Sequence, residues 1–174
     1  LKAVEWSENA HVQPGDKEGA ADLYERTVNA GLRVAAYGSY YRLGRNEEPD
    51  KALRASLDSA KALHSPLIRI WAGEEASDRM TEEKRRTLTR EASRAGKIAA
   101  EYGIKAAFEW HKNTLTDTNE SAMKLLCEAS QDNLYCLWQP TVALSMEQRT
   151  EGLDLLRQNK RLLNLHIYYW LDGV

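Results

Sequence analysis

The feature that most constrains this sequence is a strict alternation of short apolar runs with longer amphipathic stretches. Runs typical of buried strands lie at residues 1–6, 32–37, 67–71, 104–110, 134–138 and 163–170. Helical patterns separate them, at residues 16–30, from about residue 50, and at 81–102, 117–129 and 146–159. Six strands alternating with five helices predict parallel βαβ units.

Capping signals support the helix positions. Asp16 is expected to cap the first helix. Asp117 with Glu120, and Ser145 with Gln148, have the spacing of capping boxes at the starts of the last two helices.

Two α/β architectures fit this pattern, a TIM barrel and a doubly wound sheet. No G-x-G-x-x-G motif or phosphate-loop motif follows the first strand, and units of about 30 residues match those of an eight-unit barrel. We therefore predict a single domain over residues 1–174 of the (β/α)8 TIM-barrel type. It lacks the first and last units, so we expect one further βα unit before Leu1 and a strand and helix after Val174.

The composition narrows the possible partners. Among 174 residues, 24 Lys and Arg face 26 Asp and Glu, which gives none of the basic excess of a nucleic-acid-binding protein. No apolar run is long enough to cross a membrane, and the two cysteines without a leader favour the cytoplasm. We expect a small-molecule substrate, and association into a homo-oligomer through the two open sheet edges.

Aromatic residues gather at the predicted strand ends. In parallel strands these ends meet on one face, which carries the active site in barrels. We expect aromatic contacts to substrate there from Trp6, Tyr37, Trp71, Trp110, Trp138 and Trp170. The alternative is that the tryptophans fill the barrel interior.

Polar residues of the strands share one alternating face. They are Glu5, Arg69, Glu109, His111, Gln139, Asn164 and His166. Glu109 and His111 project together and are the candidate catalytic pair. Glu109, Gln139 and His166 offer two oxygens and one nitrogen from adjacent strands, a donor set suited to Mn²⁺, Mg²⁺ or Co²⁺. Alternatively, Glu109 is a solvated strand end and His166 a core residue with satisfied hydrogen bonds.

Several segments resemble a known family. VEWSENAHVQPGD, YGSYYRLG, PLIRIWAG, FEWHKNTLTDT, LWQP and NLHIYYW are similar to sugar phosphate isomerase/epimerase proteins with the xylose-isomerase-like TIM barrel. The resemblance implies a divalent metal ion (Mn, Mg, Co or Zn), with Glu109 as first ligand and base and His166 as the histidine ligand. Gln139 stands where the family has a second acid, and the family's fourth ligand has no counterpart before Val174.

The resemblance implies proton abstraction beside a sugar carbonyl through an enediolate. Glu109 takes the proton and His111 polarises an oxygen or relays the proton, while Glu5, His11, Arg69 and the aromatic residues bind the sugar. A dehydratase acting on a keto-sugar or cyclitol would begin with the same step. A carbohydrate-binding barrel without turnover is the non-enzymatic alternative, and Gln139 is its best support.

Overall fold

The computed structural model describes residues 1–141 and 144–168. Its elements alternate strand and helix along the chain. They are β1 (Ala3–Ser7), α1 (Lys17–Asn29), β2 (Arg33–Arg42), α2 (Pro49–Ala62), β3 (Leu67–Trp71), α3 (Glu82–Glu101), β4 (Lys105–Glu109), α4 (Asn119–Ala129), β5 (Leu134–Trp138), α5 (Met146–Gln158) and β6 (Leu162–Leu165).

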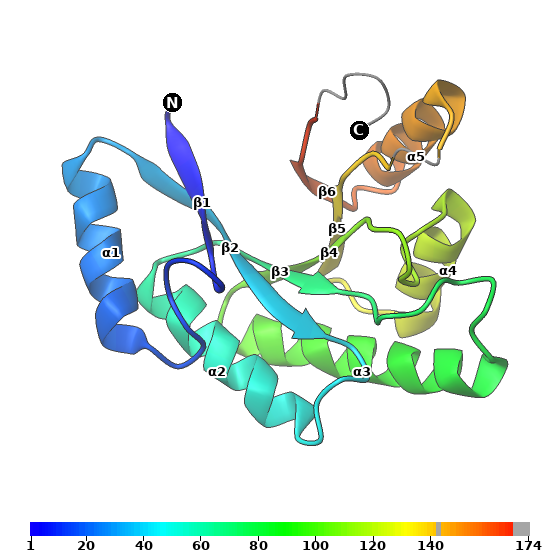
Figure 1. The fold of residues 1–174 in the computed structure, drawn as a ribbon, viewed down its shortest axis with the longest axis horizontal. Coiled ribbons are helices and arrows are strands. Elements are labelled where there is room, and N and C mark those ends of the chain that lie inside the picture. The colour runs from blue at the N-terminus through cyan, green and yellow to red at the C-terminus, as the bar shows by residue number, and fades with distance from the viewer. Residues whose placement is uncertain (142–143, 169–174) are drawn as a thin grey trace.

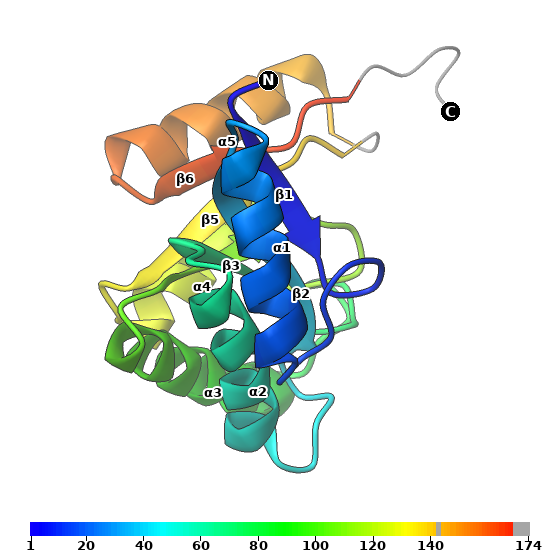
Figure 2. The ribbon, with the colours of Figure 1, turned by 90° about the vertical axis from the view of Figure 1, so that its left-hand side faces the viewer.

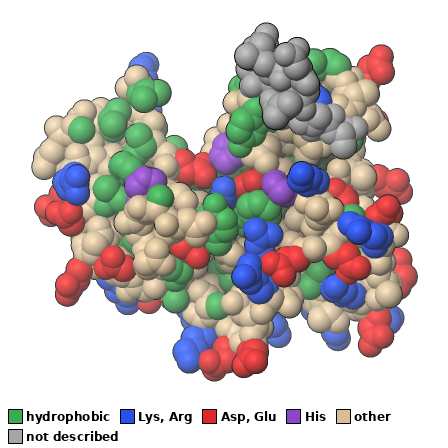
Figure 3. Space-filling model, viewed as in Figure 1, with side chains coloured by type: hydrophobic (Ala, Val, Ile, Leu, Met, Phe, Trp, Pro, Cys, Tyr) green, Lys and Arg blue, Asp and Glu red, His purple; other side chains and the backbone are tan. Residues whose placement is uncertain are grey.

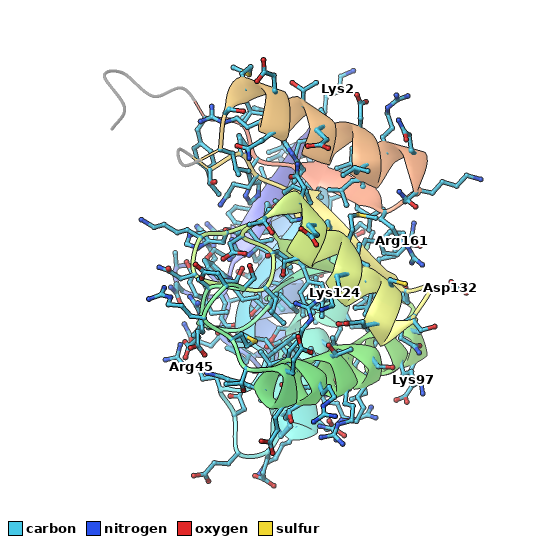
Figure 4. The ribbon with its side chains drawn as sticks, turned by 90° about the vertical axis from the view of Figure 1, so that its right-hand side faces the viewer. Lys2, Arg45, Lys97, Lys124, Asp132 and Arg161 are labelled. Carbon is cyan, nitrogen blue, oxygen red and sulfur yellow. The ribbon has the colours of Figure 1, made fainter. Side chains whose placement is uncertain are left out.

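The described strands form one parallel sheet in the order β1-β2-β3-β4-β5-β6. Each strand pairs with its neighbours in the sequence, and the connecting helices lie on the outer side of the curved sheet (Figures 1 and 2). In Figure 4, Arg45, which follows β2, marks the carboxyl ends of the strands. Arg161, which precedes β6, lies at the opposite ends. The predicted fold is confirmed as an incomplete TIM barrel of six parallel strands and five helices.

Two apolar layers hold the sheet. The larger lies between strands and helices, and includes Ile68, Phe108 and Cys136. The smaller lies on the concave face, where the buried side chains of Ala36, Leu67, Ala107 and Leu137 pack together, with Tyr135 and Leu163 against them. Ala36 and Ala107 are small, which leaves space on the concave face for the larger polar side chains at the carboxyl ends of the strands.

The predicted boundaries are close to the observed ones, with three corrections. The last strand was predicted over residues 163–170, but β6 ends at Leu165 and residues 166–168 are not part of a strand. β2 continues to Arg42 instead of ending at Tyr37, because it pairs with β3 as far as Arg42 beside Trp71. The N-cap of α4 is Thr118, whose hydroxyl accepts from the Ser121 N–H, and not Asp117. Asp117 instead accepts a hydrogen bond from the Ser77 N–H at 2.9 Å, so it joins two loops.

The other capping predictions are confirmed. Asp16 accepts from the Gly19 N–H at 2.9 Å, and Ser145 and Gln148 form the reciprocal capping box of α5. Among the helices of residues 1–141 and 144–168, none is both long and apolar enough to span a bilayer.

The packing of α5 on Trp110, the residue after β4, yields a stability prediction. A Cβ at Gly152 would lie 2.5 Å from Trp110 Cζ3, and the Trp110 side chain is 1% exposed. Gly152→Ala should gain about 0.5–1 kcal/mol of helix propensity and lose about 1–3 kcal/mol to overpacking. We expect a lower melting temperature by calorimetry.

Glu147→Ala, on the exposed part of the same helix, is the matched control and should change the melting temperature little. A Gly152→Ala variant that melts above the wild type would show that α5 does not pack on Trp110 in this way.

Candidate active site

A buried ion pair lies at the carboxyl ends of β3 and β4. Arg69 Nη1 is 2.7 Å from Glu109 Oε2, and the Glu109 residue is only 4% exposed. Arg69 Nη2 also donates to the Ser39 carbonyl at 3.3 Å. Strand alternation puts both side chains on the concave face, because Arg69 pairs with Ala107 and Glu109 follows Ala107 by two.

Gln139, just beyond β5, continues this contact toward β6. Its Nε2 donates to Glu109 Oε1 at 3.0 Å and to the Trp110 carbonyl at 3.3 Å. Its Oε1 faces His166 Nδ1 at 3.0 Å and accepts from the Tyr168 hydroxyl at 2.8 Å. The amide therefore connects the carboxylate of Glu109 to the imidazole of His166.

Two edge strands meet across the concave face through Glu5. Its Oε2 lies 3.2 Å from His166 Nε2 and accepts from Asn164 Nδ2 at 3.2 Å. The structure thus brings together Glu5, Arg69, Glu109, Gln139, Asn164 and His166, all predicted from strand alternation to share a face. We refer to Arg69, Glu109, Gln139, His166 and Glu5 as the mouth network.

An aromatic group lies beside Arg69. The Trp71 ring centroid is 4.5 Å from that of His111 and 6.2 Å from that of Tyr40. The Arg42 guanidinium lies 3.9 Å from the Trp71 centroid, and that of Arg69 lies 5.2 Å from the Tyr40 centroid. Figure 3 shows basic, acidic, histidine and hydrophobic side chains side by side near the middle of this face.

Other residues expected to contact substrate lie elsewhere. Trp110 and Tyr37 belong to the core between sheet and helices, where the Tyr37 hydroxyl donates to the Val12 carbonyl. Trp6 packs on that core and donates to Thr27 of α1, with His11 edge-on at 4.9 Å. These placements correct the expectation that the aromatic residues converge.

Trp138 does not complete the mouth either. Trp138 packs on the helix-facing core and lines a pocket of about 280 Å³ with residues of α5, including Met146 and Leu153. Trp170 lies outside the described residues. Among the predicted tryptophans that the structure describes, Trp71 alone packs beside Arg69 and His111.

Glu8 is an acidic residue near the site that the sequence prediction missed. Its Oε2 accepts from the Tyr40 N–H at 2.9 Å. Burial raises the pKa of Glu8, and the Tyr40 hydrogen bond and the charge of Arg69 only partly offset this effect. Its position in the sequence, two residues past Trp6 and after the first predicted strand, could have indicated that it lies near the site.

A family comparison identifies the fold. A family model described as xylose isomerase-like TIM barrel matches residues 1–167. The chain belongs to this family. No curated protein sequence matches it.

Several solved structures share the fold. The probable 3-DHS dehydratase AsbF involved in petrobactin synthesis, from Bacillus anthracis, is 19% identical with a TM-score of 0.79, over 96% of this chain and 62% of that one. The 3-keto-D-glucoside 4-epimerase YcjR from E. coli is 14% identical with a TM-score of 0.71, over 88% and 65%. A Mycobacterium smegmatis xylose isomerase-like TIM barrel protein in complex with magnesium is 12% identical with a TM-score of 0.68, over 96% and 61%. The chain spans less than two thirds of each.

The donor set of this xylose isomerase-like site does not fit a divalent ion. Within the described parts of the chain, no three His, Cys, Asp or Glu side chains are grouped as metal ligands. Of the three expected ligands, Glu109 is paired with Arg69, Gln139 is a neutral amide, and His166 has a partner at each ring nitrogen.

The burial of Glu8 yields a pH-dependent prediction. The pKa of Glu8 is higher in the folded chain than in the unfolded chain. The stability that Glu8 contributes is therefore fully present below the unfolded pKa and is lost as the pH rises through the folded pKa. Glu8→Gln removes this loss. The variant should gain more stability over the wild type at about pH 7 than at about pH 4, in urea unfolding.

Glu25→Gln, on the exposed face of α1, controls for the loss of one surface charge. Equal effects of Glu8→Gln at both pH values would show that Glu8 is not buried as an acid in the folded chain.

The buried ion pair yields a second stability prediction. Arg69→Met leaves the Glu109 carboxylate buried without its cation, which should cost about 3–5 kcal/mol of unfolding free energy. Arg69→Met with Glu109→Gln should cost clearly less than the sum of the two single variants in urea unfolding. Additive losses would mean that the two side chains do not interact in solution.

Proposed function

We propose that this chain is part of an enzyme that transfers a proton next to the carbonyl group of a small carbohydrate, as a sugar or sugar phosphate isomerase or epimerase. The observation that carries the proposal is the Glu109 carboxylate, buried at the carboxyl end of β4 and held by Arg69 and Gln139. In TIM barrels, catalytic residues come from these strand ends.

Glu109 is the base in this proposal. Each carboxylate oxygen has two lone pairs, and the contacts to Arg69 Nη1 and Gln139 Nε2 use one on each oxygen. A carboxylate fixed on both sides is oriented for proton abstraction, because base catalysis requires the acceptor within hydrogen-bond reach of the proton.

Arg69 and His111 serve the developing oxyanion. Proton removal beside a carbonyl places negative charge on the carbonyl oxygen, and a fixed guanidinium stabilises that charge without reorganising. The ring centroids of His111 and Trp71 are 4.5 Å apart. In this proposal His111 relays a proton between oxygens. The rings of Trp71 and Tyr40 offer flat surfaces for the apolar face of a sugar.

Dehydration of a keto-sugar or cyclitol is the second candidate. The similarity in fold to a probable 3-DHS dehydratase favours it, with a TM-score of 0.79. The first step, proton abstraction by Glu109, is the same, and the second step expels a hydroxyl that His111 would protonate. The two candidates differ in their product, since only dehydration releases water.

The test is solvent exchange and turnover on a panel of aldoses, ketoses, keto-sugars and their phosphates. In D₂O the wild type should introduce deuterium beside the carbonyl of its substrate, as followed by NMR. Glu109→Gln should reduce turnover by about 10²–10⁴-fold, the contribution of a general base. Mass spectrometry of the product separates isomerisation from loss of water.

Glu25→Gln is the matched control, since it makes the same change at an exposed position and should retain wild-type turnover. A Glu109→Gln variant with wild-type rates would place the base elsewhere. Sugar binding without any exchange or turnover would instead identify the chain as a non-catalytic carbohydrate-binding barrel.

A further inference from the structure

Each of the three side chains expected to hold a metal ion already has close partners. Glu109 Oε1 is 3.0 Å from Gln139 Nε2, and its Oε2 is 2.7 Å from Arg69 Nη1. Gln139 Oε1 lies 3.0 Å from His166 Nδ1 and 2.8 Å from the Tyr168 hydroxyl. A metal ion on these atoms would have to displace these hydrogen bonds.

His166 gives the clearest conflict with metal ligation. A histidine binds a metal through the lone pair of one ring nitrogen. Here Nδ1 faces the carbonyl oxygen of the Gln139 amide, and Nε2 faces Glu5 Oε2 at 3.2 Å. Each ring nitrogen therefore already lies against a side-chain oxygen, and a metal ion at either nitrogen would have to displace that contact.

The fixed positive charge of the mouth network is supplied by Arg69, beside the carboxylates of Glu109 and Glu5. Its guanidinium is permanently positive and forms a charge-assisted hydrogen bond to Glu109. A divalent ion bound to the same carboxylate would lie close to this cation and be repelled by it. Gln139, in turn, brings no negative charge to compensate a second cation.

Arg69 is also equipped to bind a ligand oxygen. The residue is 9% exposed, and its buried Nε has no hydrogen-bond partner among the described residues. The guanidinium has five N–H donors, of which the contacts to Glu109 and the Ser39 carbonyl use two. A planar group with donors to spare suits an oxygen that gains negative charge during the reaction.

We propose that Arg69 takes the electrophilic role that a divalent ion has in metal-dependent proton transfer, so that this site works without a metal ion between Glu109 and His166. The substrate oxygen receives N–H donors from Arg69, and Gln139 fixes Glu109 and His166 on either side. The catalytic part of this inference rests on the proposed function. The metal-binding part depends only on the side chains of the mouth network.

The first experiment measures metal binding by the full chain. The protein is dialysed against Mn²⁺, its metal content is determined by mass spectrometry, and Mn²⁺ is titrated with detection by electron paramagnetic resonance. The wild type should hold far less than one Mn²⁺ per chain. Stoichiometric Mn²⁺ that is lost in Glu109→Gln or His166→Ala would overturn the inference.

A gain-of-binding variant calibrates this measurement. Gln139→Glu supplies a second carboxylate, and Arg69→Met removes the competing cation. The double variant should bind Mn²⁺ more tightly than the wild type, after circular dichroism has shown that it is folded. A folded double variant that binds Mn²⁺ no better than the wild type would contradict the inference that Arg69 and Gln139 prevent metal binding.

The second experiment examines turnover on the substrate found by the exchange assay. Removal of metals with EDTA should leave the wild-type rate unchanged, whereas Arg69→Met should lower kcat more than it raises KM. Arg54→Met, an exposed arginine paired with Glu101, is the matched control. A rate abolished by EDTA and restored by Mn²⁺ would refute the metal-free site and leave Glu109 as base intact. Absence of turnover in every condition would refute the proposed function, while the binding measurement still decides on the metal.

Discussion

The ion pair between Arg69 and Glu109 is the interaction on which the rest of the site depends. Two charges at the concave face, both nearly closed to water, are costly unless each is paired and hydrogen-bonded. The neighbouring strands meet that need, through the Ser39 carbonyl and the Gln139 amide. Gly38 on β2 also leaves space for the ion pair. A Cβ atom at this position would lie 3.1 Å from Arg69 Nη2 and 2.9 Å from Glu5 Oε1.

Much of the fold was predictable because each element has a local signal. Residues 67–71 and 134–138 are short apolar runs between helical patterns, and both strands have these bounds in the structure. The extension of β2 could not be read in this way. Its polar and aromatic end, GSYYR, pairs with β3 only because Trp71 and the Ser39 hydroxyl supply tertiary partners.

The candidate site was predictable in its polar part and less so in its aromatic part. Strand alternation sufficed to group Glu5, Arg69, Glu109 and His166, since period-two geometry fixes the face of each side chain. The same rule assigns Trp6 and Trp110 to the opposite face, where the structure places them against α1 and α5. The tryptophans were assigned to the site because they lie near strand ends, although alternation places Trp6 and Trp110 on the other face. The partners of Gln139 could not be predicted from the sequence, because they depend on the relative positions of three strands.

The contact between Glu5 and His166 also bears on how the molecule folds. The paired strands are neighbours in the sequence, so the sheet can grow by adding one strand and helix at a time, at little entropic cost per step. Glu5 and His166, by contrast, are separated by 161 positions, with Glu5 on β1 and His166 directly after β6. Their contact forms only when the growing sheet has curved far enough for its edges to face each other. This link between the two edges of the sheet is therefore the last part of the mouth network to form, whereas Arg69, Glu109 and Gln139 lie on or next to adjacent strands and can meet before it.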